Sequence, residues 1–287
     1  MPVPRLFETP SDPREQWVHV VATLMALGGP ETRSALVEEI SGEALPNADA
    51  LLVREQRVLD DGTAVDVVAR GAGWTLALHS TLAFDLDEGE RLAAVYDSLT
   101  AQWKDQVILV AITPDRRPPA GVLSAAAGGT RNIPHRRWLR GRDWIQERPE
   151  RGNAQGTDLV LLKEADYFFT PRVAELYRLE GLMPLIGADV RASFAGMFFD
   201  LNDLAPAPRI QTENNSARVS FPRTGDPQVE VTLAGGDLSL AVRNGSAGPG
   251  YRGDGEWQRL NVGAADDYVA ARTWTQATAR GLLPARR

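Results

Sequence analysis

The sequence contains no cysteine, and its 287 residues include only three histidines and two lysines. Without cysteine there is no disulfide, no thiolate zinc site and no cysteine nucleophile. A metal site built from several histidines would need nearly all of His19, His79 and His135. A mechanism that requires a lysine has only Lys104 and Lys163 as candidates.

Long hydrophobic runs are also missing. The longest apolar stretch, around Val18 to Leu27, is far shorter than the roughly 20 residues that a membrane span needs. The opening residues, MPVPRLFETPSDPRE, lack the apolar core of a signal peptide. We therefore expect a cytoplasmic protein with no membrane partner.

The composition is that of an ordinary globular protein, with 43% hydrophobic and 24% charged residues. The length allows one large domain or two modest ones. There are 31 basic and 38 acidic side chains, which give a formal net charge of −7. Attraction of the whole surface to nucleic acid or anionic lipid is therefore not expected.

The first 115 residues carry the clearest structural signals. Asp12, followed by Pro13 and Glu15, is typical of a helix start. Apolar residues then recur at helical spacing until Gly28-Gly29-Pro30, where we expect the helix to end before a shorter second helix. Strands are expected at 51–58, 64–69, 74–80 and 107–113, with a helix that contains Leu92, Val95, Tyr96 and Leu99 before the last of them.

The remaining chain is read as three kinds of segment. Residues 115–130 are predicted to form a loop, 147–156 a linker and 244–255 a Gly-rich loop. Helices are predicted at 136–146, 157–179 and 264–280, and alternating runs after Pro208 predict an antiparallel sheet. We expect an α/β domain at 1–147, a helical segment at 148–205 and a β-rich C-terminal domain at 206–287.

Residues 54–81, REQRVLDDGTAVDVVARGAGWTLALHST, resemble the core of the PD-(D/E)XK nuclease superfamily. The resemblance extends over residues 10 to about 115 and implies a core of helix, three-stranded meander, helix and strand. In that superfamily, an acid on the first helix, an aspartate on the second strand and an E-x-K motif on the third strand converge. They hold one or two Mg²⁺ ions for phosphodiester hydrolysis.

Mapped onto this chain, the resemblance assigns catalytic positions to Glu15, Asp66, His79 and Thr81. Glu15 and Asp66 would hold Mg²⁺ or Mn²⁺ if the protein is active, and Gln56 resembles a polar residue of some relatives. His79 stands in place of the motif's acid and Thr81 in place of its lysine. Because one ligand and one positive charge are lost, the resemblance implies impaired catalysis.

Each of these positions also has a purely structural interpretation. Glu15 suits a capping box, and Asp66, His79 and Thr81 can be strand-end residues that face solvent. Acidic residues after the third strand would cap the next helix, and Lys104 would close that helix. The acids concerned are Asp85, Asp87 and Glu88.

A second feature is a basic segment, Arg116 to Arg142, which contains seven arginines and no acid. We expect Arg136, Arg137 and Arg140 to lie on one side of a helix with tryptophans interleaved, where they would bind the phosphates of DNA or RNA. The alternative is a solvated basic face, or a surface that pairs with acidic parts of the same chain.

Three functions are therefore considered. The first is a nuclease-fold protein with impaired catalysis that binds nucleic acid or a protein partner, in a defence or repair context. The second is an active metal-dependent nuclease with a remodelled site. The third is a structural or regulatory protein without a nucleic-acid role. A protein partner would bind through the C-terminal domain.

Overall fold

The structure, a computed structural model, describes residues 13–81, 86–150, 152, 154–169, 181–182, 185, 209–213, 216–221, 229–235, 237–243 and 252–262. The chain divides into two compact units, residues 1–176 (unit 1) and 177–287 (unit 2). Each unit has its own sheet.

Unit 1 is built on a five-stranded mixed sheet in the order β1-β2-β3-β4-β5. The first three strands form an antiparallel meander, whereas β3, β4 and β5 run parallel to one another. Their carboxyl ends therefore meet at one edge, which we call the carboxyl edge. The strands are β1 (Leu52–Val58), β2 (Ala64–Gly71), β3 (Trp74–Ser80), β4 (Gln106–Thr113) and β5 (His135–Arg137).

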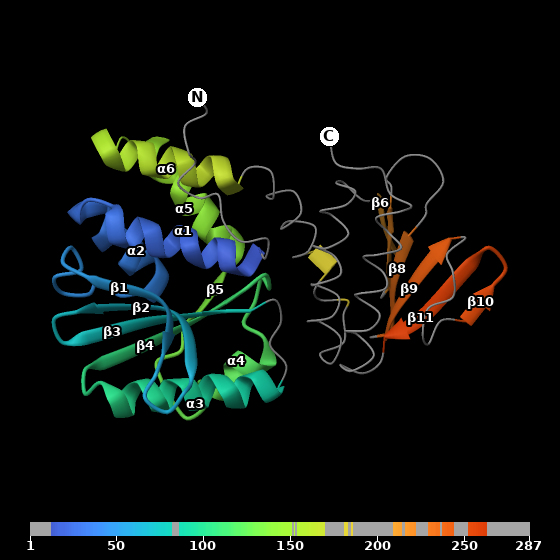
Figure 1. The fold of residues 1–287 in the computed structure, drawn as a ribbon, viewed down its shortest axis with the longest axis horizontal. Helices are drawn as coiled ribbons and strands as arrows, with labels where there is room; N and C mark the ends of the chain where they lie inside the picture. Colours follow the sequence, from blue (N-terminus) through green and yellow to red (C-terminus); the bar gives the residue numbers. More distant parts are fainter. Residues whose placement is uncertain are drawn as a thin grey trace. The chain divides into compact units, whose positions relative to one another are not determined.

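Helices cover both faces of this sheet (Figure 1). One face carries α1 (Pro13–Leu27), α2 (Pro30–Ser41), α5 (Trp138–Glu150) and α6 (Gly156–Phe169). The other face carries α3 (Leu86–Gln102) and α4 (Ala120–Ala125). Because both faces are covered, every residue of β3 is buried, and β4 is buried after its first residue.

The core on the α3 side joins the helix to the sheet. Leu92, Val95 and Leu99 of α3 are fully buried against apolar residues of β2, β3 and β4. The tip of the β1–β2 hairpin is tied to the same helix, because the Ser98 hydroxyl donates a hydrogen bond to the Asp61 carboxylate. These contacts hold α3 against the sheet.

The predicted elements of unit 1 are largely confirmed. The first helix begins at Pro13, and β3 spans the predicted residues 74–80. The prediction of an unbroken loop over 115–130 is wrong, because α4 lies within it. The predicted linker at 147–156 is wrong in part, since α5 continues to Glu150.

A further correction concerns the basic segment. His135, Arg136 and Arg137 form β5, which pairs with the end of β4, and α5 begins only at Trp138. The spacing predicted that all three arginines lie on one helix, but Arg136 and Arg137 lie on β5 and only Arg140 lies on α5. The short strand has no apolar alternation, and it is defined by its pairing with β4.

Unit 2 contains a six-stranded antiparallel sheet in the order β10-β11-β9-β8-β7-β6. Alternating residues such as Val219, Val231 and Leu240 are buried, which confirms the predicted antiparallel sheet. One strand lies within the predicted loop 244–255, which corrects that prediction. The strands are β6 (Arg209–Glu213), β7 (Ser216–Phe221), β8 (Val229–Ala234), β9 (Asp237–Arg243), β10 (Arg252–Asp254) and β11 (Trp257–Val262).

The division between the units falls at 176/177, between the predicted boundaries at 147/148 and 205/206. The helix α6, which the sequence placed in a separate segment, packs against α5 and α1 of unit 1. Asp158 of α6 accepts hydrogen bonds from the Gly29 N–H at 2.7 Å and the Thr32 hydroxyl at 2.6 Å. The predicted helix 157–179 corresponds to α6 as far as Phe169, whereas its residues 170–179 and the predicted helix 264–280 lie outside the described residues.

Candidate functional site

Asp66 and His79 lie side by side on the α3 face of the sheet. His19 of α1 contacts Glu55 of β1 at 3.1 Å, so Glu55 points to the α1 face, and Val67 is its register partner on β2. Because side chains alternate along a strand, Asp66 points to the opposite face. His79 is opposite Asp66 in the β2–β3 register, one residue beyond the Val67–Leu78 pair.

His79 is held between two carboxylates. Its Nδ1 is 3.7 Å from Oδ2 of Asp66, and its Nε2 is 3.7 Å from Oε2 of Glu88 on α3. The His79 side chain is 9% exposed, whereas the two carboxylates are 28% and 26% exposed. The imidazole is thus flanked by two acids, one beside each of its ring nitrogens.

Both carboxylates have further contacts that fix their positions. The backbone N–H of Ser80 donates a 2.6 Å hydrogen bond to Oδ2 of Asp66. Arg91 donates a 3.2 Å hydrogen bond to Glu88 from one turn along α3. The contact with the His79 ring lowers the pKa of Glu88 against the opposing effect of burial, and the charge of Arg91 adds to the lowering. Glu88 is therefore ionised at neutral pH.

Asp66, His79 and Glu88, which we call the His79 cluster, do not fit a magnesium ion. The two carboxylates contact different nitrogens of one ring, so a single ion cannot contact His79 and both acids. Within the described residues, no group of three or more acidic or histidine side chains is arranged to hold a metal. Histidine also favours softer ions than Mg²⁺.

The other two predicted catalytic positions are less informative. Glu15 lies in the first turn of α1, and its side chain is outside the described residues. Thr81 directly follows β3, and its backbone N–H donates a 3.0 Å hydrogen bond to the Ile112 carbonyl. The structure thus brings Asp66 and His79 together and adds Glu88, which the sequence had assigned to helix capping.

Most of the basic segment is paired within the chain. Arg140 donates hydrogen bonds of 2.6 and 2.9 Å to the two carboxylate oxygens of Glu39 on α2, and Arg136 donates one of 3.0 Å to the Glu39 carbonyl. Arg131 is bound by both oxygens of Asp97. Arg137 and Arg142 contact Asp143.

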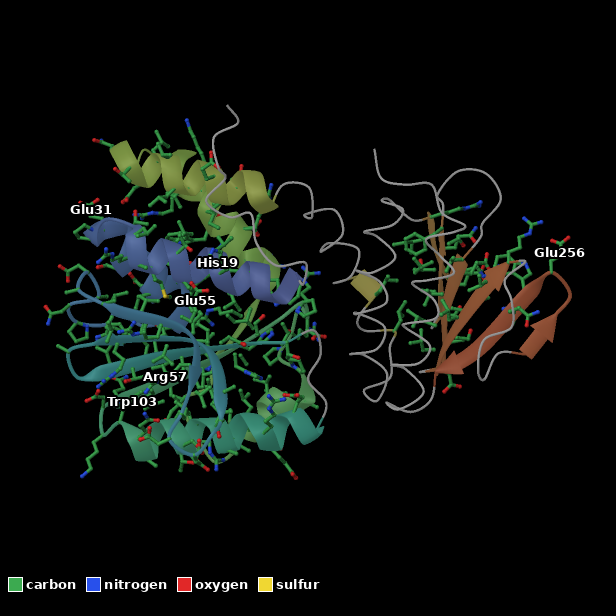
Figure 2. All side chains as sticks on the ribbon, in the orientation of Figure 1. His19, Glu31, Glu55, Arg57, Trp103 and Glu256 are labelled. Carbon is green, nitrogen blue, oxygen red and sulfur yellow. The ribbon has the colours of Figure 1, made fainter. Side chains whose placement is uncertain are left out.

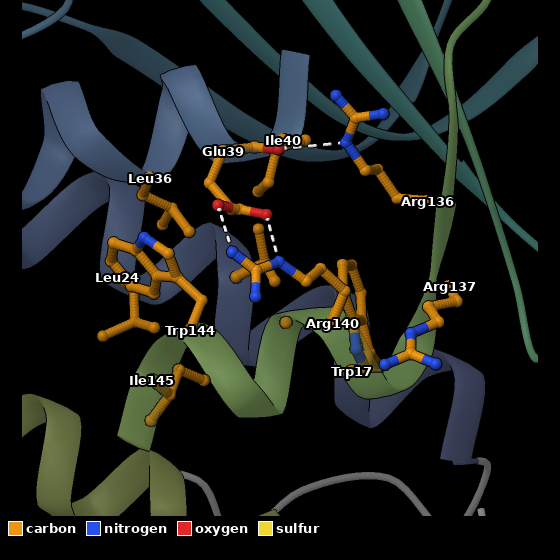
Figure 3. A pocket seen from close by; sticks show the side chains of 12 residues that line it. Trp17, Leu24, Leu36, Glu39, Ile40, Arg136, Arg137, Arg140, Trp144 and Ile145 are labelled. Atoms are coloured by element: carbon orange, nitrogen blue, oxygen red, sulfur yellow. Dashed lines mark hydrogen bonds and ion pairs between the residues drawn. The ribbon is translucent and has the colours of Figure 1, made fainter. Parts of the chain in front are cut away.

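Arg136, Arg137 and Arg140 border a pocket between α1, α2, β5 and α5 (Figure 3). The pocket encloses about 370 Å³, its open mouth included, and its walls are mostly apolar. Figure 3 shows Arg140 reaching across to Glu39, while Arg136 points to the end of α2. Two of the three predicted phosphate-binding arginines, Arg136 and Arg140, therefore join α2 to β5 and α5 through Glu39, which the sequence did not indicate. Arg137 contacts Asp143 of α5 instead.

Arg116 and Arg117 differ from the rest of the segment. Both follow β4 at the carboxyl edge, both are exposed, and neither has an ion-pair partner within the part of the chain that the structure describes. In the register between β3 and β4, His79 lies next to Ala111. Arg116 and Arg117 follow Ala111 by a few residues, so they come shortly after the strand position beside His79.

The neighbouring strand ends at the carboxyl edge form a neutral hydrogen-bond chain. The Asp115 N–H donates to the Thr113 hydroxyl oxygen at 3.0 Å, and this hydroxyl lies 2.9 Å from Nε2 of His135. Burial, with the nearby charge of Arg136, lowers the pKa of His135 to about 4. His135 is thus uncharged at neutral pH, and its tautomer decides which of Nε2 and the Thr113 hydroxyl donates.

No family model, curated protein or solved structure matches the chain. None of the described helices has the combination of length and apolar character that a membrane span requires. The His79 cluster and its surroundings are therefore the basis on which a function can be proposed.

Proposed function

We propose that unit 1 is a PD-(D/E)XK-like domain without metal-dependent cleavage, and that it binds nucleic acid at the carboxyl edge. The observation that carries the proposal is the position of His79 between Asp66 and Glu88. The imidazole, flanked by the two acids, occupies the place where the resemblance implies a metal ion. This agrees with the loss of the motif's acid and lysine.

The topology supports the first half of the proposal. An antiparallel meander is followed by a helix and then by a strand parallel to the third, with helices on both faces. This is the order that the resemblance implies. Asp66 is also on the second strand and His79 near the end of the third, as the mapping requires.

The charges support the second half. Ligands of open α/β sheets bind beyond the carboxyl ends of parallel strands. Arg116 and Arg117 are exposed at that edge, whereas Arg131, Arg136 and Arg140 are committed to acids or carbonyls of the same chain. Two guanidinium groups without an ion-pair partner in the described ranges can bind phosphates there although the total charge is negative.

The first experiment combines cleavage and binding of labelled single- and double-stranded DNA and RNA. With Mg²⁺ or Mn²⁺ present, we expect no cleavage beyond that of Asp66→Ala protein. We expect binding that weakens with salt. The salt slope of the Arg116→Gln/Arg117→Gln variant should be smaller, by roughly 0.7–0.9 for each phosphate that the variant no longer binds. Arg209→Gln/Arg218→Gln, which removes two exposed arginines of unit 2, is the matched control.

Each half of the proposal can fail separately. Cleavage that disappears in Asp66→Ala would support an active nuclease with a remodelled site. Equal salt slopes for the wild type and the Arg116/Arg117 variant would remove the binding site from the carboxyl edge. Absence of binding to any of the four nucleic acids would favour a structural or regulatory protein whose partner is another protein.

A further inference from the structure

The outer side of β1 is an open edge of the sheet. β1 pairs with β2 on one side and has no strand on its other side within the described residues. Leu52 and Val58 are 53% and 57% exposed, which places them among the few large apolar side chains at the surface of the described part of the chain. A seven-residue edge strand presents a row of N–H and C=O groups that can pair with another strand.

One hydrogen bond shows which backbone groups of β1 face β2 and which face outward. The Leu59 N–H donates to the Thr63 carbonyl at 2.8 Å, across the β1–β2 hairpin. Because hydrogen-bonding groups alternate along an antiparallel strand, the odd-numbered residues of β1 bond to β2. The N–H and C=O groups of the even-numbered residues therefore point outward, and these residues are Leu52, Arg54, Gln56 and Val58.

We propose that two copies of this chain pair through β1 in an antiparallel fashion, about a twofold axis at Gln56. The outward groups of Gln56 then bond to Gln56 of the second copy, and those of Arg54 bond to Val58. Glu55 lies opposite Arg57 in a pair without mutual backbone bonds, where side chains are closest. By symmetry this ion pair forms twice, and the sheet continues across the dimer.

The charges of β1 select this register over its neighbours. An axis at Arg54 places Arg54 opposite itself, an axis at Glu55 places Glu55 opposite itself, and an axis at Arg57 places Arg57 opposite itself. Like charges directly opposite each other destabilise a strand pair. Charged residues usually protect an edge strand from pairing, but here one register turns them into attractive partners.

The side chains that this register requires are available. Glu55 is 39% exposed, and the contact of His19 with it is made to its Oε2. Arg57 is exposed and has no ion-pair partner within the described ranges. Figure 2 shows Glu55 below His19 of α1 and Arg57 further along β1. An interface of one strand pair is small, so we expect a weak, concentration-dependent dimer.

Sedimentation velocity of the full chain over a range of concentrations tests the pairing. We expect reversible dimerisation of the wild type. Glu55→Arg and Arg57→Glu should each weaken it by roughly tenfold or more, because two attractive pairs become repulsive. The double variant Glu55→Arg/Arg57→Glu should recover it. A mixture of the two single variants should form heterodimers, because one chain then has arginine at both positions and the other has glutamate at both.

Gln56→Pro is a second variant that leaves the charges in place. It removes an outward N–H without touching the bonds to β2, and an edge strand tolerates proline at such a position. We expect it to be monomeric with an unchanged far-ultraviolet circular dichroism spectrum. A wild type that stays monomeric at all concentrations, or a dimer that is unaffected by Glu55→Arg and Gln56→Pro, would overturn the proposal. A dimer that the double variant does not restore would overturn the register.

Discussion

Replacing Gly89 of α3 with alanine tests how α3 and α4 are held together beside the His79 cluster. A Cβ atom at Gly89 would lie 2.6 Å from the Gly121 carbonyl oxygen and 2.8 Å from the Gly121 Cα. Both neighbours are backbone atoms of α4, so no side-chain rotation can relieve the overlap. One of the two helices must move.

Two effects of this substitution oppose each other. In an open helix, alanine is more favourable than glycine by up to about 1 kcal/mol. Overpacking of a close backbone contact costs about 1–3 kcal/mol. Because the overlap is with backbone, we expect the second effect to dominate and Gly89→Ala to lower the free energy of unfolding by about 1–2 kcal/mol. Glu88 precedes Gly89, so the same movement should separate Glu88 from His79.

Urea unfolding followed by tryptophan fluorescence measures this change. Glu90→Ala is the matched control, because Glu90 is the exposed next residue of the same helix and should change stability by no more than about 0.5 kcal/mol. If Gly89→Ala is as stable as the wild type, or more stable, then α3 and α4 do not approach each other as closely as the structure shows, and the reasoning fails.

Three further predictions concern other contacts. Because the pKa of His135 falls from 6.5 to about 4 on folding, the unfolded state binds more protons between these values, and stability should fall as pH falls from 6.5 to 4. In the wild type this loss of stability should be at most about 3 kcal/mol. In His135→Gln the urea midpoint should change less with pH over this range; identical pH profiles of the two proteins would contradict the burial of His135. Glu39→Gln should lower the free energy of unfolding by about 1 kcal/mol, because it removes the bidentate partner of Arg140. In a double-mutant cycle, the same substitution should have no effect in an Arg140→Met background. Trp74→Phe should lower the free energy of unfolding in urea by about 1–3 kcal/mol, because the buried indole donates a 2.8 Å hydrogen bond to a backbone carbonyl that would be left unpaired; wild-type stability would show that water replaces the indole.

The sequence by itself determined the regular elements whose signals are local. The apolar run WTLALHS was enough to place β3 at 74–80. Pro13 was enough to place the start of α1. Caps, turns and apolar periodicity act within a few residues, so they can be read without knowing what the segment packs against.

Only the tertiary structure decided which side chains meet. Glu88 suits a helix start in the sequence, and its contact with His79 exists only because α3 packs on the face of the sheet to which Asp66 and His79 point. Asp143 and Glu147 are the acids close to Arg140 in sequence, yet its bidentate partner is Glu39, about a hundred residues earlier, whose carbonyl also binds Arg136. Charges pair across the distances that folding brings together, and the local pattern carries no record of those distances. For the same reason β5 was missed, because three polar residues become a strand only through pairing with β4.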